Sequence, residues 1–347
     1  MQVELKQRGR ASIDFVAALG GALRASRLQV ASEIAAAGVR NESLPADLDA
    51  RMAAFEYAVS VAPTHARYAG LRDWLGLHHG PIAMEAFDEV REALVPALEA
   101  LRSRGPCTLT LATEDPTPDY MRSVAFHGTG TWDGHDHMGF IHGEFVHRRL
   151  VARNFGGDIY AQRRQVLAEL QHGPYTRILE LGTSSGNLTV ALSQQFPDAA
   201  ITGIDVSRRM LEQAQRVGNE LGYAWRLLQR RAEQTGLPAE SFDLVAAYSL
   251  AHELPQTVTR QMLRESLRVL RPGGEFILGD VVPFSAQDRL TQCWAQLEAL
   301  HGGEPYWREF CSLDMASVAR EEGFAEARYF SRGEQSFPHI LLARKAA

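Results

Sequence analysis

The sequence is poor in cysteine and contains no long apolar run. Its three cysteines, Cys107, Cys293 and Cys311, are far apart and form no C-x-x-C pair. An odd and scattered set of thiols argues against a disulfide framework and fits a reducing compartment. No apolar run approaches the ~18 residues that suggest a membrane span, and the first residues lack a basic-then-apolar signal pattern. We therefore expect a cytoplasmic protein without a membrane partner.

An excess of basic charge is also lacking. The 347 residues carry a formal net charge of −6, and the isoelectric point is near 6.1. Proteins that bind nucleic acid or anionic lipid carry a basic patch, so we expect neither partner and favour a small-molecule substrate. The hydrophobic share of 45% and the charged share of 22% are ordinary for a globular chain, and the length is sufficient for two domains.

The segment 177–187, RILELGTSSGN, is the clearest motif present. It combines a short apolar strand with a turn containing Gly182 and Gly186, and an apolar periodic helix follows over 188–196. Glycine has no Cβ and tolerates positive φ, so such a turn lets the backbone approach a ligand closely. The helix behind the turn presents free N–H groups at its N-terminus. This arrangement predicts a nucleotide or cofactor site.

A second apolar strand, 200–205, ends in an acid. Asp205 lies 19 residues after Gly186 and 23 after Gly182. In a βαβ unit, a carboxylate at this point can accept hydrogen bonds from both ribose hydroxyls. A Rossmann fold that binds NAD is the alternative interpretation, and the missing third glycine of the dinucleotide fingerprint argues against it.

These two features resemble the class I S-adenosylmethionine (SAM) dependent methyltransferase superfamily. In that family an acid-x-Gly-x-x-x-Gly turn holds the amino-acid part of SAM, and the acid after the second strand holds the ribose. Further segments match in order: 241–248 resembles the fourth strand, 270–278 the Leu-Arg-Pro-Gly-Gly turn into the fifth, and 323–344 the closing antiparallel hairpin. The resemblance covers residues 160–347. It implies SAM as cofactor and an α/β, Rossmann-like, doubly wound fold.

The resemblance also implies the residues that hold SAM, with two departures from the family pattern. Ser184 replaces the middle glycine of the turn, and Arg231 stands where an acid near the adenine is expected. The adenine contact is therefore assigned to the Ala232 backbone and the Glu233 carboxylate. The implied set is Glu180, Gly182, Ser184, Gly186, Asp205, Val206, Met210, Ala232, Glu233 and Tyr248.

The sequence predicts three parts. Residues 1–115 have apolar residues at helical spacing, for example Phe87, Val90 and Leu94, and are expected to form a helical domain. Residues 116–158 are expected to form a cap rich in histidine, glycine and aromatic residues, and residues 159–347 the SAM-binding domain. The apolar helical faces indicate either a buried core or the interface of a homodimer.

Five of the twelve histidines lie within residues 120–147. This segment resembles the stretch before the cofactor domain in small-molecule methyltransferases of natural-product pathways. Three interpretations stay open: a cap over the SAM pocket, a metal site built on His135 and His137 with His142 or Glu144, and histidines that satisfy loop hydrogen bonds. We favour the cap and expect no metal, because SAM already carries the electrophile. The catalytic residues predicted from the cap are Tyr120, His127, Trp132, His135 and His142.

The end of the predicted fourth strand has two interpretations. Tyr248 and His252 either touch the cofactor, or His252 and Glu253 cap the helix that begins after Pro255. The sequence does not separate the two.

Three functions are compatible with the SAM motifs. The favoured one is methyl transfer to a small-molecule acceptor, which leaves S-adenosylhomocysteine. The alternative is cyclisation of SAM itself, as in methyltransferase-like proteins of bacterial biosynthetic clusters: the α-amine attacks the γ-carbon and gives azetidine-2-carboxylate and methylthioadenosine. A non-catalytic SAM-binding subunit is least favoured, because Glu180, Gly182, Gly186 and Asp205 are all present. The binding motifs are common to all three.

Overall fold

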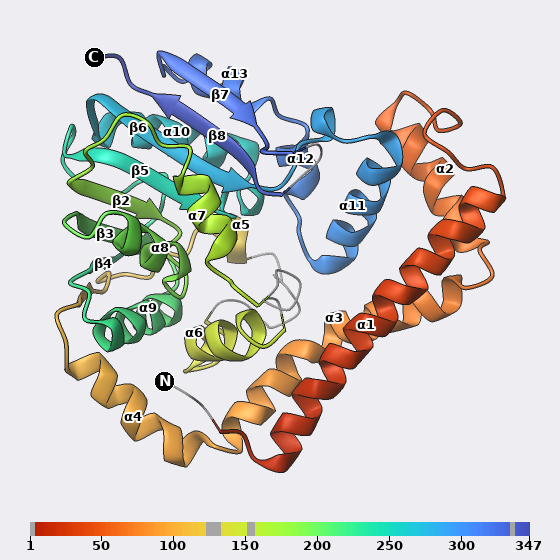
Figure 1. Cartoon of the computed structure of the whole chain (residues 1–347), viewed down its shortest axis with the longest axis horizontal. Coiled ribbons are helices and arrows are strands. Elements are labelled where there is room, and N and C mark those ends of the chain that lie inside the picture. The colour runs from red at the N-terminus through yellow and green to blue at the C-terminus, as the bar shows by residue number, and fades with distance from the viewer. Residues whose placement is uncertain (1–3, 123–132, 151–156, 334–336) are drawn as a thin grey trace.

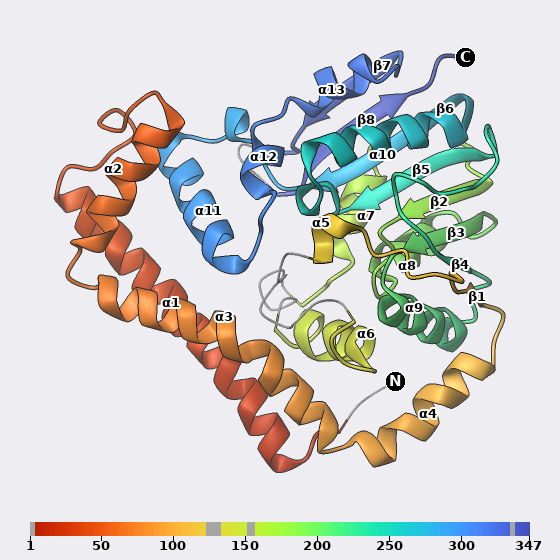
Figure 2. The same ribbon diagram turned by 180° about the vertical axis from the view of Figure 1, so that it is seen from behind.

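One mixed sheet organises the chain (Figure 1, Figure 2). The computed structural model describes residues 4–122, 133–150, 157–333 and 337–347. The sheet has eight strands in the order β1-β4-β3-β2-β5-β6-β8-β7. Strands β1 to β6 pair in parallel, and β8 runs antiparallel to both β6 and β7. The strands are β1 (Thr108–Thr110), β2 (Arg177–Leu181), β3 (Ala200–Asp205), β4 (Arg226–Gln229), β5 (Phe242–Tyr248), β6 (Leu270–Asp280), β7 (Glu326–Phe330) and β8 (His339–Arg344).

The strand order reverses between β2 and β5. From β2 the chain builds outward to β3 and β4, and it then returns to place β5 and β6 on the other side. In open α/β sheets, ligands bind beyond the carboxyl ends of the strands at such a reversal. The predicted α/β, Rossmann-like, doubly wound fold with a closing antiparallel hairpin is confirmed.

Side chains alternate across the sheet and give it two cores. Leu179 and Leu181 of β2 face the core that is covered by α10 (Gln256–Val269) and α13 (Met315–Glu321), whereas Ile178 faces the other core. That second core is covered by α7 (Ala161–Leu167), α8 (Asn187–Gln195) and α9 (Arg208–Leu221). Burial on both faces explains why these strands read as continuous apolar runs in the sequence.

Three N-terminal helices form a separate layer: α1 (Gln7–Ala36), α2 (Leu48–Ser60) and α3 (His65–Asp88). The next helix, α4 (Arg91–Ser103), packs against α9, where Nδ2 of Asn219 donates to the carbonyl oxygen of Leu101 at 2.7 Å. A helix from much later in the chain, α11 (Arg289–Gly302), completes their core. The ring of its Trp294 lies 5.0 Å from Phe55 and 5.9 Å from Tyr68, centroid to centroid. Across the described ranges, no helix combines the length and apolarity that a bilayer crossing requires.

The boundary expected at residue 115 does not separate the two layers. Strand β1 lies before it in the chain but pairs with β4 at the sheet edge, with Thr108 opposite Arg226. Conversely, α11 lies after it and packs among the N-terminal helices. One strand of the sheet, β1, therefore lies before residue 115 in the chain, and one helix of the helical layer, α11, lies after it.

The described part of the cap lies between α3 and α9 (Figure 1). It consists of α6 (Met138–Phe140) and a π-helix, η1 (Ile141–His147), after a short helix, α5 (Asp119–Arg122). Two glycines of the cap, Gly139 and Gly143, allow it to approach α9 and the glycine turn closely. A Cβ on Gly139 would lie 2.0 Å from the carbonyl oxygen of Arg209 in α9, and one on Gly143 would lie 3.3 Å from Cβ of Ser185. The cap therefore docks against both α9 and the glycine turn.

Candidate active site

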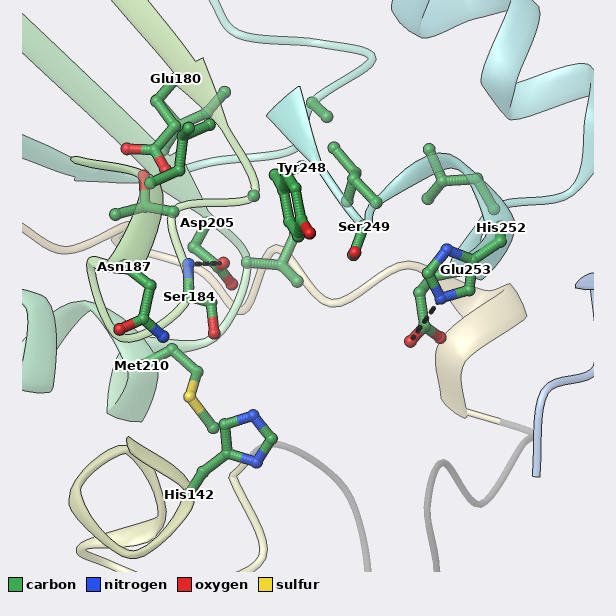
Figure 3. A pocket seen from close by; sticks show the side chains of 18 of the residues that line it. His142, Glu180, Ser184, Asn187, Asp205, Met210, Tyr248, Ser249, His252 and Glu253 are labelled. Carbon is green, nitrogen blue, oxygen red and sulfur yellow. Dashed lines mark hydrogen bonds and ion pairs between the residues drawn. The ribbon is translucent and has the colours of Figure 1, made fainter. Parts of the chain in front are cut away.

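A cavity of about 610 Å³ lies at the carboxyl ends of β2, β3 and β5. Small-ligand sites have volumes of roughly 300–1,000 Å³. In Figure 3, Glu180 and Asp205 lie on one side of this cavity, His252 and Glu253 lie on the other, and Tyr248 stands between them. We name the wall around Glu180 and Asp205 the cofactor end, and the wall around His252 and Glu253 the far end.

The glycine turn after β2 is built from left-handed backbone. Gly182 has φ of 68° and Ser184 has φ of 49°. A Cβ on Gly182 would lie 2.9 Å from Cδ1 of Leu250. Left-handed backbone is uncommon for residues other than glycine, so Ser184 needs local support. Its N–H donates a hydrogen bond of 2.8 Å to Oδ2 of Asp205, which explains how the turn keeps its shape without the family's middle glycine.

Asp205 stands at the tip of β3 and lines the cavity. Its second oxygen, Oδ1, accepts from the N–H of Ser207 at 2.8 Å. Burial raises the pKa of Asp205 to about 6, although the two backbone N–H groups favour the charged form. Each oxygen keeps further lone pairs for a ligand hydroxyl. The geometry is that of a fixed acceptor beside the glycine turn.

Glu180 is fully enclosed at the end of β2. Oγ1 of Thr189 donates to it at 2.6 Å, and burial raises the pKa of Glu180 to about 8. Arg163 of α7, which the sequence prediction omitted, lines the cavity nearby, with its Cζ 4.3 Å from the ring centroid of Tyr248. Its Nε is buried and has no hydrogen-bond partner among the described residues. Arg163 lies in the helix before the glycine-turn motif, and no sequence pattern around it indicated a role in the site.

Nine of the ten residues predicted to hold SAM line this cavity; they come from the segments that follow or end β2, β3, β4 and β5. Gly186 is the exception. It has φ of 91° and precedes α8, where an added Cβ would lie 3.3 Å from the Trp225 ring. Its contribution in the structure is to the turn into α8. The nine are Glu180, Gly182, Ser184, Asp205, Val206, Met210, Ala232, Glu233 and Tyr248.

The five predicted cap residues divide into three groups. Tyr120 and His142 line the cavity. His135 does not: its ring lies 5.5 Å from the Phe87 ring, centroid to centroid, and its Nε2 lies 3.6 Å from Asp88, because the turn before α6 places it against α3. His127 and Trp132 lie outside the described residues.

The cap also contributes residues that the sequence prediction missed. His147 lines the cavity beside His142, with the two ring centroids 4.1 Å apart, and Nδ1 of His147 lies 3.2 Å from Nδ2 of Asn187. In the described part of the chain, the side chains close enough to share a cation are His252, Glu253 and Glu304 rather than the histidines of the cap.

The far end is built on an imidazole and a buried carboxylate. Nδ1 of His252 lies 2.5 Å from Oδ1 of Asp280 at the end of β6. Burial alone would lower the pKa of His252, but Asp280 outweighs it and the pKa is raised to about 10. The interpretation in which His252 and Glu253 cap α10 is wrong: the residue before α10 is Pro255, and no side chain caps that helix. His252 and Glu253 line the cavity instead.

Comparison with known proteins finds similarity to methyltransferases. Residues 178–274 match a protein family described as a methyltransferase domain. The chain is similar to demethylmenaquinone methyltransferase of Thermus thermophilus, with 32% identity over 131 residues, which covers 38% of this chain and 58% of that protein. It is also similar to trans-aconitate 2-methyltransferase of an Azoarcus species, with 33% identity over 32% of this chain and 41% of that protein. The chain spans about half the length of the curated relatives it matches.

The chain is also similar to solved structures over about half of its length. A SAM-dependent methyltransferase from Aquifex aeolicus has a TM-score of 0.42 at 20% identity, covering 52% of this chain and 88% of that one. Phosphoethanolamine N-methyltransferase 2 of Haemonchus contortus, in complex with SAM, has a TM-score of 0.40 at 15% identity, covering 55% and 53%. The sheet order, the glycine turn and the acid after β3 agree with the match of residues 178–274 to a methyltransferase domain.

Proposed function

We propose that this chain transfers the methyl group of SAM to a small-molecule acceptor held at the far end of the cavity. One observation carries the proposal: nine residues predicted from separate motifs to hold SAM line a common cavity with Tyr120 and His142 of the cap. A cavity of this size, lined in part by side chains of the cap, suits a small acceptor better than a polymer. The wall between the two ends, at Tyr248, is where the two substrates would meet.

The cofactor end has the chemistry that SAM requires. Asp205 would accept hydrogen bonds from the ribose hydroxyls, and Ala232 and Glu233 would contact the adenine. The buried guanidinium of Arg163 would bind the carboxylate of the methionyl part, since its Nε lacks a partner among the described residues. Bound SAM supplies an electrophilic methyl carbon on a sulfonium. The chain therefore has to hold a nucleophile in line with that carbon and exclude water.

Cyclisation of SAM to azetidine-2-carboxylate is the second candidate. The observation that favours it is Glu180, a fully enclosed carboxyl group whose pKa is raised to about 8 by burial. It lies near Arg163, at the end of the cavity assigned to the methionyl part of SAM. A carboxylate there could take the proton from the α-amine before that amine attacks the γ-carbon.

Product analysis tests both candidates. The protein is incubated with SAM alone and with SAM plus panels of small amines, alcohols and carboxylates. S-adenosylhomocysteine that forms only when an acceptor is present supports methyl transfer. Methylthioadenosine that forms from SAM alone, above the background measured with Asp205→Ala, supports cyclisation and rejects the first proposal.

A homodimer through the N-terminal helices stays part of the proposal. Phe15 and Leu28 of α1 and Leu77 of α3 are 52%, 69% and 68% exposed, which leaves apolar surface on this layer. Light scattering coupled to size exclusion would give twice the monomer mass if these residues form an interface. A monomer at micromolar concentration would exclude it.

A further inference from the structure

We infer that the hydroxyl of Ser249 lies at the point of methyl transfer and hydrogen-bonds the reacting atom of the acceptor, which is then a nitrogen or an oxygen. This inference rests on the proposed methyl transfer and adds a catalytic residue to it. Three features of Ser249 carry it: its left-handed backbone, the position of its hydroxyl in the cavity, and the hydrogen bonds that fix the turn around it.

The backbone of Ser249 is strained. Ser249 follows directly on β5 and has φ of 50°. Among the described residues other than glycine, Ser184 and Glu240 are the two others with positive φ. Ser184 and Ser249 line the cavity, whereas Glu240 is exposed in the turn before β5. Glycine adopts this backbone at little cost and serine does not, and strained residues of this kind concentrate at functional sites.

The hydroxyl of Ser249 is available to a ligand. In the described part of the chain it makes no hydrogen bond, and it points into the cavity between Tyr248 and His252 (Figure 3). The neighbouring hydroxyl of Tyr248 is already engaged, because it donates to Oε1 of Gln162 at 3.1 Å. A serine hydroxyl both donates and accepts, so it can bond to a nitrogen or an oxygen. A carbon nucleophile would offer it no partner.

Ser249 stands where cofactor and acceptor would meet. The next residue, Leu250, reaches the glycine turn, since a Cβ on Gly182 would lie 2.9 Å from its Cδ1. In Figure 3, Ser249 lies between Asp205 of the cofactor end and His252 of the far end. SAM bound at the glycine turn would therefore present its methyl group on the side of the cavity that Ser249 occupies.

Hydrogen bonds fix the turn that carries Ser249. The N–H of Ser249 donates to the carbonyl oxygen of Gly279 at 2.8 Å. Oδ2 of Asp280, a fully buried carboxylate, accepts from the N–H groups of Leu250 and Ala251 at 3.1 and 2.8 Å. A hydroxyl on backbone held in this way is preorganised, because little freedom is lost when it binds a ligand.

The transfer step leaves the hydroxyl of Ser249 unchanged. A lone pair of the acceptor nitrogen or oxygen attacks the methyl carbon, so a new bond to that carbon forms while the C–S bond breaks. The electron pair of the C–S bond stays on sulfur, and the sulfonium becomes the neutral thioether S-adenosylhomocysteine. Where the reacting atom carried a hydrogen, one proton passes to water. Ser249 holds the reacting atom in line with the C–S bond and neither gains nor loses a proton.

Sinefungin tests the point of transfer without turnover, because this SAM analogue carries an amine where SAM carries its methyl group. Its N–H groups stand in for the reacting atom of an acceptor. Calorimetry should show that Ser249→Ala binds sinefungin roughly tenfold more weakly than wild type, because a hydrogen bond to a charged group is lost. Affinity for S-adenosylhomocysteine, which has no group at that position, should change less than about threefold.

Ser249→Gly separates the hydroxyl from the strain. Its sinefungin affinity should fall as in Ser249→Ala, whereas its midpoint of urea unfolding should lie above that of Ser249→Ala, because glycine relieves the left-handed backbone. Glu240→Gly is the matched control, since it relieves the same kind of strain at an exposed position. It should leave both affinities unchanged. If Ser249→Ala does not fold, as judged by circular dichroism, Ser249→Gly carries the test.

Unchanged sinefungin affinity in the Ser249 variants would overturn the inference. Equal losses for sinefungin and S-adenosylhomocysteine would also overturn it, because Ser249 would then belong to the cofactor end. Failure of methyl transfer is distinguishable through turnover, which should fall roughly tenfold in Ser249→Ala with any acceptor that reacts. Unchanged turnover rejects the inference alone, whereas no S-adenosylhomocysteine from any acceptor rejects the proposed function and, with it, the role of Ser249 in transfer.

Discussion

The two ends of the cavity are built in different ways. The cofactor end depends on backbone, since Gly182 and Ser184 adopt left-handed conformations and the N–H of Ser184 is bonded to Asp205, 21 residues along the chain. The far end depends on side chains, since His252 is oriented by Asp280 from another strand. A site that is built from backbone depends on one short sequence motif. A site that is built from side chains can change through single substitutions. The comparison explains how relatives can share a cofactor and differ in acceptor.

Gly182→Val should have the largest effect, because it breaks the backbone-built end. The left-handed φ of 68° and the nearby Leu250 both oppose a side chain there. We expect SAM affinity, measured by calorimetry, to fall roughly a hundredfold or more. Gly222→Val is the matched control, because Gly222 has φ of 77° and open space around it. Similar losses of SAM affinity in both variants would mean that backbone strain alone explains the result.

Glu180→Gln tests the buried charge at the cofactor end. The pKa of Glu180 is 4.5 in its ordinary state and about 8 in the folded protein, so the folded state holds the proton more tightly. Its stabilising contribution is fully present below pH 4.5 and is lost as the pH rises through 8, a change of roughly 5 kcal/mol. Urea unfolding from pH 4.5 to 8.5 should show a shallower decline in Glu180→Gln than in wild type. Glu326→Gln, at an exposed acid on β7, is the control. If the free energy of unfolding of Glu180→Gln declines with pH as steeply as that of the wild type, the raised pKa of Glu180 is contradicted.

Gly139→Ala tests whether cap docking is needed for turnover but not for cofactor binding. The added Cβ would lie 2.0 Å from the backbone oxygen of Arg209, so α6 must move away from α9. Overpacking of this kind costs roughly 1–3 kcal/mol. We expect turnover to fall roughly thirtyfold while SAM affinity changes less than about threefold. Gly70→Ala places a methyl group in open space on α3 and should leave both unchanged; parallel losses of turnover and affinity in Gly139→Ala would show that the cap serves the cofactor.

Asp205→Ala removes the acceptor that we assign to the ribose. The hydroxyls would lose a charged partner, and SAM affinity should fall about tenfold or more. Isothermal titration at pH 7.5 measures the effect, with the exposed Asp198→Ala as control. In the wild type, affinity should also weaken below pH 6, because the pKa of Asp205 is raised to about 6 and a protonated carboxyl accepts less strongly. Full affinity in a folded Asp205→Ala variant would remove Asp205 from the site.

His142→Ala should have the smallest effect. His142 lines the cavity from the π-helix of the cap and faces neither the ribose acceptor nor the far-end carboxylate (Figure 3). We expect turnover to fall about threefold to tenfold with SAM affinity unchanged, the pattern of a residue that orients the reacting group. Steady-state kinetics on S-adenosylhomocysteine release measures it, and His78→Ala, on the exposed side of α3, is the control. Unchanged turnover would leave His142 as a packing residue.

The sequence was informative where function depends on local geometry. The glycine turn and Asp205 could be predicted because strand, turn and acid follow one another in the chain. The pairing of His252 with Asp280 could not, because the residues are 28 apart and meet only when β5 and β6 pair. Arg163 was missed because nothing in α7 distinguishes it from the neighbouring Arg164. His135 was placed in the site because histidines cluster in the sequence, but the turn before α6 places it against Phe87 and Asp88 of α3.

The position of α11 has a consequence for how this protein can be divided. Because Trp294 of α11 fills the core of the N-terminal helices, and β1 extends the sheet from the other direction, no cut in the chain yields two units that each keep their own core. Removing residues 1–110, which include β1, would expose the buried face of α11 and leave β4 as an unprotected sheet edge. Exchange of the helical layer between relatives would therefore require two separate segments of the chain to be transferred together.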